Sequence, residues 1–449
     1  MRRLIATTTL VLVAAAIQAA GAAAAQTPTQ AAYVPGELLV RFDGGGEHLV
    51  KLPQGIDVPS AERALDANPA VDYAAPNYIA HASGVPDDPG IAGVPGGWQR
   101  TQWNFLPCGS LCGQSATPLQ YQARGGLNAP EAWEILKQRG AAGGRGARVA
   151  VVDTGVAYMT KKPQFLKSPD FSRTQFVPGF DFVDNDRQPL DEDGHGTHVA
   201  GTIGERTGNH FGLTGLASRA KLMPIRVLDS EGFGTARNIA RGIRYAAAHK
   251  AQVINMSFEF SLGVNSCAKI KGICSAVKYA FKRGALVVAA AGNENGEPVA
   301  FPAGAPHVLG VGRITKDACL ASESRTGAGL DLVAPGGGFP LLSSCGSDDS
   351  LFTLGVPIFQ LTFDGPRYTH FGYPGGFEGT SMAAAHVSGV AAMVIASRVV
   401  GSSPTAVECQ LEGTARHGDS QLGQPYDPRL FGAGLVDAAA AVTARAAGC

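Results

Sequence analysis

The chain has 449 residues, of which 45% are hydrophobic and 16% are charged. Lys plus Arg and Asp plus Glu number 37 each, so the formal net charge at pH 7 is zero. This balance gives no electrostatic reason to expect a nucleic acid or an anionic lipid as a partner.

The amino terminus has the parts of a secretory signal peptide. Arg2 and Arg3 precede a largely apolar stretch at 4–17, and three alanines at 23–25 form a small-residue cleavage site. We expect residues 1–25 to be removed and the mature protein to be secreted, either outside the cell or into a periplasm. No later stretch of about 20 residues lacks glycine and polar groups, so no membrane anchor is expected.

Residues 26–83 form a separate segment before the main domain. The sequence at 35–42 alternates like a strand. The stretch from 61 to 82 predicts a short helix that stops before Pro69, followed by an extended segment.

From 127 to 442, apolar runs alternate with helical or loop sequence. The predicted strands are RVAVVD at 148–153, KLMPIRVL at 221–228, AQVINMS at 251–257, ALVVAAA at 285–291 and HVLGVG at 307–312. Such alternation predicts one large α/β domain with a mostly parallel sheet and helices on both faces. A helix over 125–136 is expected to have Asn128 as its N-cap, and residues 345–377 look like an insertion.

Two polar residues stand at the ends of such elements. Asp153 closes the first strand of the domain, and the carboxyl ends of parallel strands are where ligands and chemistry collect. His195 follows the acidic turn DEDG, and Gly194 and Gly196 beside it allow another backbone to approach the imidazole. Taken singly, such an Asp is more often a turn residue and such a His more often a capping or surface residue.

Ser381 opens GTSMAAAHVSGVAAMVIAS, residues 379–397, a helix of small apolar residues. Alone, it would be interpreted as an N-cap. With Asp153 and His195 it completes the set that activates a serine, because the imidazole takes the hydroxyl proton and the carboxylate fixes and stabilises the imidazole. The chain order Asp, His, Ser and the Ala383 in place of the last glycine of a G-x-S-x-G elbow argue against a lipase or esterase.

These three segments resemble the signature blocks of the subtilisin-like serine proteases, the subtilases, and the similarity extends from Trp103 to the carboxyl terminus. The resemblance implies a subtilisin-like three-layer α/β fold over residues 98–449, with a small α+β pro-segment before it. It implies a serine endopeptidase that hydrolyses extended protein or peptide substrates through an acyl-enzyme, with Asp153, His195 and Ser381 as the triad. A monomeric enzyme without a catalytic cofactor is expected.

The resemblance also implies a substrate-binding set. Asn293, after the strand at 285–291, would donate its side-chain amide to the oxyanion of the tetrahedral intermediate. Residues 254–258 resemble the family strand that lines the pocket for the residue before the scissile bond. Residues 230–234 resemble the strand edge that pairs with an extended peptide. The implied contacts are Ser257, Phe258, Glu259, Gly232, Gly234 and Gly292. Glu259 replaces a small glycine usual in subtilisins, and we expect it to be solvated, with an acidic contact to basic substrate residues as the alternative.

Residues 26–83 resemble the inhibitory pro-segments of subtilases. The resemblance implies a zymogen in which the extended end, at 78–83, lies in the substrate cleft and is cut by the enzyme itself. The alternative is an N-terminal subdomain that stays attached.

Calcium is the expected ligand. Residues 168–171 and 204–215 resemble two family segments that share a structural ion, bound by hard oxygen donors. The implied ligands are the side chains of Asp170 and Asn209 and the backbone oxygens of Thr207, Phe211 and Leu213. A separate acidic group, Asp184, Asp186, Asp191 and Asp193, is expected to be a solvated loop, with a second ion as the alternative.

Eight cysteines, an even number, fit an oxidising compartment. Sequential pairing is expected (108 with 112, 267 with 274, 319 with 345, 409 with 449), and free buried thiols are the alternative.

Two rival functions make different predictions. An aspartic protease would need a second Asp-Thr-Gly or Asp-Ser-Gly beside the one at 153–155, and the sequence has none. A binding protein on an inactive protease fold would have lost a triad or oxyanion residue, and all four are present.

Overall fold

The computed structural model describes residues 33–43, 45–82, 101–109, 122–207, 212–261, 263–342, 345, 355–418 and 421–449. The predicted signal peptide and the boundary between the pro-segment and the main domain lie outside these residues, as do Cys112, Asn209 and Phe211.

The amino-terminal unit is a small α+β layer with its own core. Its elements are β1 (Tyr33–Phe42), β2 (Glu47–Lys51), α2 (Val58–Asp66) and β3 (Val71–Ala82). Asp57 caps α2 by accepting the Ser60 N–H at 3.0 Å. One face of α2 packs on the antiparallel sheet, and the core is made of Leu38, Val40, Val58, Ala61, Leu65, Val71 and Ala74. The strand, helix and extended segment predicted here are confirmed.

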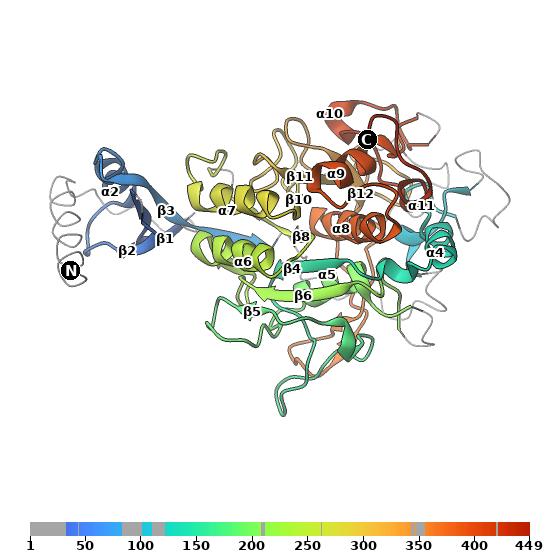
Figure 1. The fold of residues 1–449 in the computed structure, drawn as a ribbon, viewed down its shortest axis with the longest axis horizontal. Helices are drawn as coiled ribbons and strands as arrows, with labels where there is room; N and C mark the ends of the chain where they lie inside the picture. Colours follow the sequence, from blue (N-terminus) through green and yellow to red (C-terminus); the bar gives the residue numbers. More distant parts are fainter. Residues whose placement is uncertain are drawn as a thin grey trace.

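This unit lies at one end of the molecule, and β3 runs from it into the main domain beside α6 and α7 (Figure 1). There β3 pairs antiparallel with two short strands, β7 (Phe233–Thr235) on one side and β9 (Phe258–Phe260) on the other. One sheet therefore joins the amino-terminal unit to the main domain.

The main domain is built on a seven-stranded sheet in the order β12-β11-β10-β8-β4-β6-β5, and its paired strands are parallel. The strands are β4 (Arg148–Asp153), β5 (Phe180–Asp181), β6 (Lys221–Arg226), β8 (Val253–Met256), β10 (Leu286–Ala290), β11 (Val308–Ile314) and β12 (Leu332–Pro335). All five predicted strands are present. Their unbroken apolar runs fit strands that are covered on both faces. The sequence analysis missed β5 and β12, which are too short to show a periodic pattern.

Helices cover both faces of this sheet (Figure 1). One pair, α6 and α7, packs against β4, β6, β8 and β10, while α5 and α8 pack together and contact β4, with α8 also crossing β8, β10, β11 and β12. The helices are α4 (Ala129–Gln138), α5 (His195–Gly204), α6 (Ala236–Ala248), α7 (Lys271–Lys282), α8 (Thr380–Ser397), α9 (Pro404–Gly413), α10 (Pro428–Phe431) and α11 (Ala438–Thr443), with 3-10 turns at Trp103–Phe105, Ala142–Gly144 and Arg173–Gln175. A short hairpin, β13 (Thr362–Phe363) and β14 (Phe371–Gly372), belongs to the predicted insertion. The predicted three-layer α/β fold is confirmed.

Helix α8 is the central helix of the domain. It is long and apolar enough to cross a membrane, but 89% of its apolar window is buried inside the protein. Its small side chains allow neighbours to approach closely: a Cβ atom added to Gly389 would lie 2.9 Å from the Leu216 side chain. The apolar composition of α8 is therefore explained by its burial in the core of the domain.

Three of the four predicted disulfides are present, Cys267–Cys274, Cys319–Cys345 and Cys409–Cys449. Cys108 is also disulfide-bonded, and its predicted partner lies outside the described residues. Asn128 is the N-cap residue of α4, as predicted, but its side chain makes no capping hydrogen bond. It accepts the Cys108 N–H at 2.9 Å and donates to Asp437 at 2.5 Å.

Candidate active site

Three neighbouring strands bring the predicted catalytic residues to one edge of the sheet. β4 ends at Asp153, β8 is followed by Ser257, and β10 leads into the turn that carries Asn293. The register pairs Val152 with Met256 and Met256 with Ala289. The carboxyl ends of these strands therefore lie side by side.

Asp153 and His195 form a fully buried pair. Nδ1 of His195 lies 2.7 Å from Oδ1 of Asp153, and both side chains are 0% exposed. Burial alone would lower the pKa of His195, but the charge and hydrogen bond of Asp153 outweigh it, so the pKa lies above its ordinary value of 6.5. The other nitrogen, Nε2, is buried without a hydrogen-bond partner among the described residues.

Glycines beside His195 let the backbone pack tightly, as predicted. A Cβ atom on Gly196 would lie 2.1 Å from the Gly155 carbonyl oxygen, and Gly194 has a φ of 111°. The amino end of α5 is thus packed directly on the turn after β4.

A second carboxylate, Asp191, fixes this arrangement, whereas the sequence analysis placed it in a solvated acidic loop. Asp191 is 0% exposed and accepts hydrogen bonds from the Thr154 hydroxyl at 2.9 Å and the Thr197 hydroxyl at 2.6 Å. The Thr154 hydroxyl in turn accepts the Gly196 N–H at 2.9 Å. Asp191 therefore ties the start of α5 to the end of β4. The signal in the sequence that could have indicated this role is the position of Asp191, four residues before His195.

The interpretation of Ser381 as an N-cap is excluded. α8 begins at Thr380, its N-cap is Gly379, and no side chain caps it. Ser381 is instead held to Ser257: the Ser381 hydroxyl donates to the Ser257 carbonyl at 3.1 Å, and the Ser257 hydroxyl donates to the Ser381 carbonyl at 2.8 Å. The hydroxyl thus lies at the carboxyl end of β8, next to the strand that ends in Asp153.

The Asn293 side chain lies at the start of α8, where it contacts Thr380. Its Oδ1 accepts the Thr380 N–H at 2.9 Å, which ties the turn after β10 to the start of α8. Its Nδ2 is buried without a partner among the described residues. A buried amide donor without a partner destabilises the fold unless a ligand or a water molecule accepts its hydrogen bond. This leaves a donor available beside Ser381.

Comparison with known proteins agrees with this geometry. A family model described as the subtilase family matches residues 144–434. The chain belongs to the subtilase family.

Relatives of this subtilase include named proteases. A thermophilic serine proteinase from Bacillus sp. (strain AK1) is 33% identical over 338 residues, which cover 75% of this chain and 66% of that protein. Thermitase from Thermoactinomyces vulgaris is 34% identical over 289 residues, 64% of this chain and 86% of thermitase. A solved protease structure from Pseudoalteromonas arctica PAMC 21717 has a TM-score of 0.57 at 31% identity and covers 71% of this chain and 94% of that one. This subtilase is accordingly a serine-type endopeptidase.

The two segments of this subtilase that are predicted to contact the substrate pair with β3 at Gly234 and at Phe258. Ala80 pairs with Gly234 on β7 and with Phe260 on β9, and Ala82 pairs with Phe258. Gly234 lies beside the paired backbone of β3, as expected. Glycine is required there by a different contact, because a Cβ atom would lie 2.4 Å from the Val227 carbonyl oxygen. Gly232 has a φ of 77°, which a left-handed turn requires.

The expectation that Glu259 is solvated was wrong. Its side chain is 3% exposed, and Oε1 accepts the Asn293 N–H at 3.2 Å. Gly292, with a φ of 110°, packs against the same carboxylate.

The region predicted to hold calcium contains two buried carboxylates. Asp170 is 0% exposed, and its Oδ2 accepts the Leu213 N–H at 3.1 Å. Glu205, missed by the sequence analysis, is also 0% exposed, and neither of its oxygens has a well-aligned hydrogen bond among the described residues. Burial and the charge of Asp170 raise the pKa of Glu205 well above its usual range, although the nearby Leu361 N–H lowers it. A hard cation held by oxygen ligands fits this pair.

The expectation of a solvated loop is confirmed for Asp184, Asp186 and Asp193, which are exposed, and is wrong for Asp191. The Asp191 carboxylate is buried against Thr154 and Thr197, and Asp184 pairs with Arg226 at 2.7 Å. In the described part of the chain, no group of three or more His, Cys, Asp or Glu is arranged to hold a metal ion.

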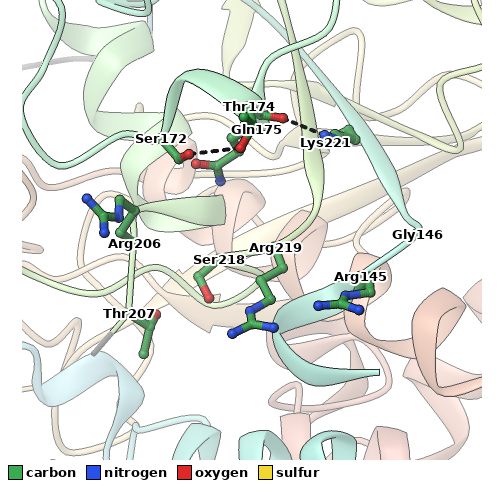
Figure 2. A pocket seen from close by; sticks show the side chains of 10 residues that line it. All are labelled: Arg145, Gly146, Ser172, Thr174, Gln175, Arg206, Thr207, Ser218, Arg219 and Lys221. Carbon is green, nitrogen blue, oxygen red and sulfur yellow. Dashed lines mark hydrogen bonds between the residues drawn. The ribbon is translucent and has the colours of Figure 1, made fainter. Parts of the chain in front are cut away.

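One surface pocket lies away from these residues (Figure 2). It has a volume of about 710 Å³ and is lined by Arg145, Gly146, Ser172, Thr174, Gln175, Arg206, Thr207, Ser218, Arg219 and Lys221. Lys221 begins β6, and Arg145 precedes β4. The pocket is therefore at the amino ends of the strands, whereas the predicted catalytic residues are at their carboxyl ends.

Proposed function

We propose that this subtilase is a secreted endopeptidase, made as a self-processing zymogen, that cleaves extended protein substrates with Asp153, His195 and Ser381 as its triad. The observation that carries the proposal is the buried His195–Asp153 pair, whose Nε2 has no described partner, at the same sheet edge as the Ser381 hydroxyl. These are the three parts that serine activation needs.

Each residue has a defined step. The Ser381 hydroxyl turns from the Ser257 carbonyl to Nε2 of His195, gives up its proton there and attacks the substrate carbonyl carbon. Asp153 holds Nδ1–H and stabilises the imidazolium. The oxyanion accepts a hydrogen bond from Nδ2 of Asn293. His195 then passes the proton to the leaving amine, and water, activated by the same imidazole, hydrolyses the acyl-enzyme.

Substrate binding uses the two edges that hold β3. A peptide between β7 and β9 pairs through its backbone, which accepts many side chains. Ser257, Phe258 and Glu259 form one edge, Gly232 and Gly234 belong to the other, and Gly292 lies beside the reacting carbonyl.

The proposal includes three segments of the chain. Residues 1–25 are the signal peptide, 26–83 the inhibitory pro-segment and 98–449 the peptidase domain. β3 supports inhibition because it already occupies both edges that a substrate would need. Contacts outside these edges also hold the unit: Asn77 accepts the Arg237 N–H at 3.1 Å, and Asp66 pairs with Lys271 at 3.2 Å.

Structural calcium and secretion complete the proposal. Asp170, with Glu205 beside it, would hold the ion together with the loop oxygens expected from Thr207, Asn209, Phe211 and Leu213; the ion would neutralise the buried carboxylates. The disulfides fit an oxidising, extracellular compartment.

An irreversible serine-hydrolase probe tests this function. We expect a fluorophosphonate to label Ser381 of the mature protein, as read by peptide mass mapping. Ser381→Ala should prevent both labelling and removal of residues 26–83 in a host that lacks other secreted proteases. A folded, unlabelled mature protein would instead support a binding module, and normal trimming of the Ala variant would contradict self-cleavage.

A further inference from the structure

Two pockets adjoin at the amino ends of the central strands. The pocket of Figure 2 has a volume of about 710 Å³, and a second one has a volume of about 740 Å³. Arg145 and Gly146, just before β4, line both pockets. Lys221 of the first pocket begins β6 and Gln252 of the second precedes β8, and these two strands flank β4 in the sheet. The two pockets therefore form one surface.

Cations line this surface, and carboxylates do not. No Asp or Glu among the described residues lines either pocket, although the whole chain carries 37 basic and 37 acidic side chains. The excess of positive charge is therefore a local feature. We refer to six side chains of the two pockets as the basic track: Arg139, Arg145, Arg206, Arg219, Lys221 and Arg398.

The basic track has no counter-charge within the described part of the chain. Four of its guanidinium groups take part there in no ion pair and no hydrogen bond, namely those of Arg145, Arg206, Arg219 and Arg398. The other two side chains donate only to neutral carbonyl groups, Arg139 to those of Val442 and Thr443 and Lys221 to that of Thr174. All six residues are exposed, so an anion from outside can reach them.

The carboxylates that stand beside Arg206 do not supply this charge. Asp170, whose backbone carbonyl accepts the Arg206 N–H at 3.2 Å, and Glu205, the preceding residue, are both 0% exposed. They are the pair assigned above to calcium, and an ion bound there would offset their negative charge. The Arg206 side chain is exposed instead.

The other lining groups indicate the kind of anion that fits. Ser172, Thr174 and Ser218 bring hydroxyl groups to the first pocket, and Gln252 and Ser402 bring an amide and a hydroxyl to the second. These groups donate to and accept from hydroxyl groups such as those of a sugar.

Two other classes of polyanion fit less well. No aromatic side chain of the described chain lines either pocket, and single-stranded nucleic acids are held by stacking on such side chains. The large hydrophobic side chains that are exposed lie outside both pockets, so an anionic lipid surface would find no large apolar anchor there.

We propose that the basic track binds an acidic polysaccharide that spans both pockets. Its carboxylate or sulfate groups pair with the arginines, whose planar guanidinium groups bind such anions through two parallel hydrogen bonds. Its hydroxyl groups contact the Ser, Thr and Gln side chains. The inference does not depend on the proposed catalytic residues.

The position of the basic track leaves the candidate active site open. Arg145 precedes β4 and Asp153 ends it, and the six residues of this strand span about 20 Å. A polysaccharide bound at the amino ends of the strands would therefore anchor the enzyme without covering the edge where peptides are cleaved.

Fluorescence anisotropy of an end-labelled heparin oligosaccharide tests binding to the wild-type mature enzyme. We expect neutral dextran not to compete, and a polyphosphate or a single-stranded oligonucleotide of the same charge to bind at least about 10-fold more weakly. Equal affinity for either of these anions overturns the assignment to a polysaccharide. Inorganic sulfate, at the same concentration of sulfate groups, should not displace the oligosaccharide. Displacement by it would mean that the pockets take free anions, which also overturns the proposal.

Three variants locate the site. At 0.15 M salt, Arg145→Gln/Arg219→Gln should raise Kd about 10-fold, and Arg398→Gln about threefold, because each removes contacts that release counterions. The control, Lys282→Gln/Arg283→Gln, removes two exposed cations at the end of α7 and should leave Kd within about twofold of the wild-type value. An unchanged Kd in the Arg145 and Arg219 variant overturns the site, and an unchanged Kd in Arg398→Gln overturns the span over both pockets.

Hydrolysis of a short neutral peptide distinguishes this site from the substrate cleft. We expect saturating oligosaccharide to leave kcat/KM within about twofold of its value without ligand. Competitive inhibition would place the oligosaccharide in the cleft and overturn the proposal. The variants should cleave the same peptide at the wild-type rate, which also shows that they are folded. A protein without peptidase activity that still binds the oligosaccharide through Arg145 and Arg219 would contradict only the proposed function.

Discussion

Nδ1 of His195 lies 2.7 Å from Oδ1 of Asp153, and both side chains are fully buried. Asp153 can therefore fix the imidazole with its proton on Nδ1 and leave Nε2 to accept the serine proton. We expect Asp153→Asn to lower kcat by about 10⁴-fold with little change in KM, because the amide favours the wrong tautomer. Steady-state kinetics on mature enzyme measure this. A loss below about tenfold would contradict the assigned role.

The pH dependence of activity should report the same pair. The charge of Asp153 raises the pKa of His195 above 6.5, and only the neutral imidazole can accept a proton. kcat/KM should therefore fall as the pH drops through an apparent pKa above 6.5. In Asp153→Asn, the loss of the charge should move this acid limb to lower pH, while the maximal rate also falls. An acid limb that stays in place would show that another group controls it.

Much of this site could be predicted from local sequence. The apolar run that ends in Asp153 and the glycines around His195 describe short-range packing, and the structure places both residues as that packing requires. The role of Ser381 depended on the presence of the other two, because a hydroxyl at a helix start is by itself typical of a cap.

The sequence predictions that were wrong concern side chains whose contacts come mainly from distant segments of the chain. Glu259 is buried where β3, far earlier in the chain, lies along β9, so no pattern around residue 259 could indicate it. Asn128 contacts Asp437 across 309 positions. Asp191 was grouped with neighbouring acids by sequence, whereas its actual partners, Thr154 and Thr197, lie next to the Asp153–His195 pair.

Calcium should stabilise the fold through Asp170. In a Ser381→Ala background, which stops self-digestion, excess EDTA should lower the melting temperature. At a calcium concentration of 100 times Kd the ion contributes about 2.7 kcal/mol. Asp170→Ala should abolish the difference between calcium and EDTA, measured by calorimetry. Asp186→Asn, in the separate acidic group, should retain it. Identical melting curves with and without EDTA would remove the ion assignment.

His386 should make stability depend on pH. It is fully buried in α8, with Nδ1 at 2.7 Å from the Met382 carbonyl and Nε2 at 2.7 Å from the Asn104 amide nitrogen. Burial lowers its pKa to about 3. Between pH 3 and 6.5, the unfolded chain binds a proton at this residue that the folded chain does not. Its contribution is therefore complete above 6.5 and is lost as the pH falls toward 3, at up to about 1.4 kcal/mol per pH unit.

Urea unfolding of the Ser381→Ala protein from pH 7 to pH 4 measures this dependence. His198, whose pKa burial also lowers to about 3, contributes in the same window, as do carboxylates at its acid end. Comparison with His386→Gln isolates one histidine, because the other groups are shared. The variant is expected to be less stable at pH 7, since it loses buried contacts, but its free energy of unfolding should fall less steeply with decreasing pH. Parallel curves for the two proteins would mean that His386 binds a proton in the folded state within this range.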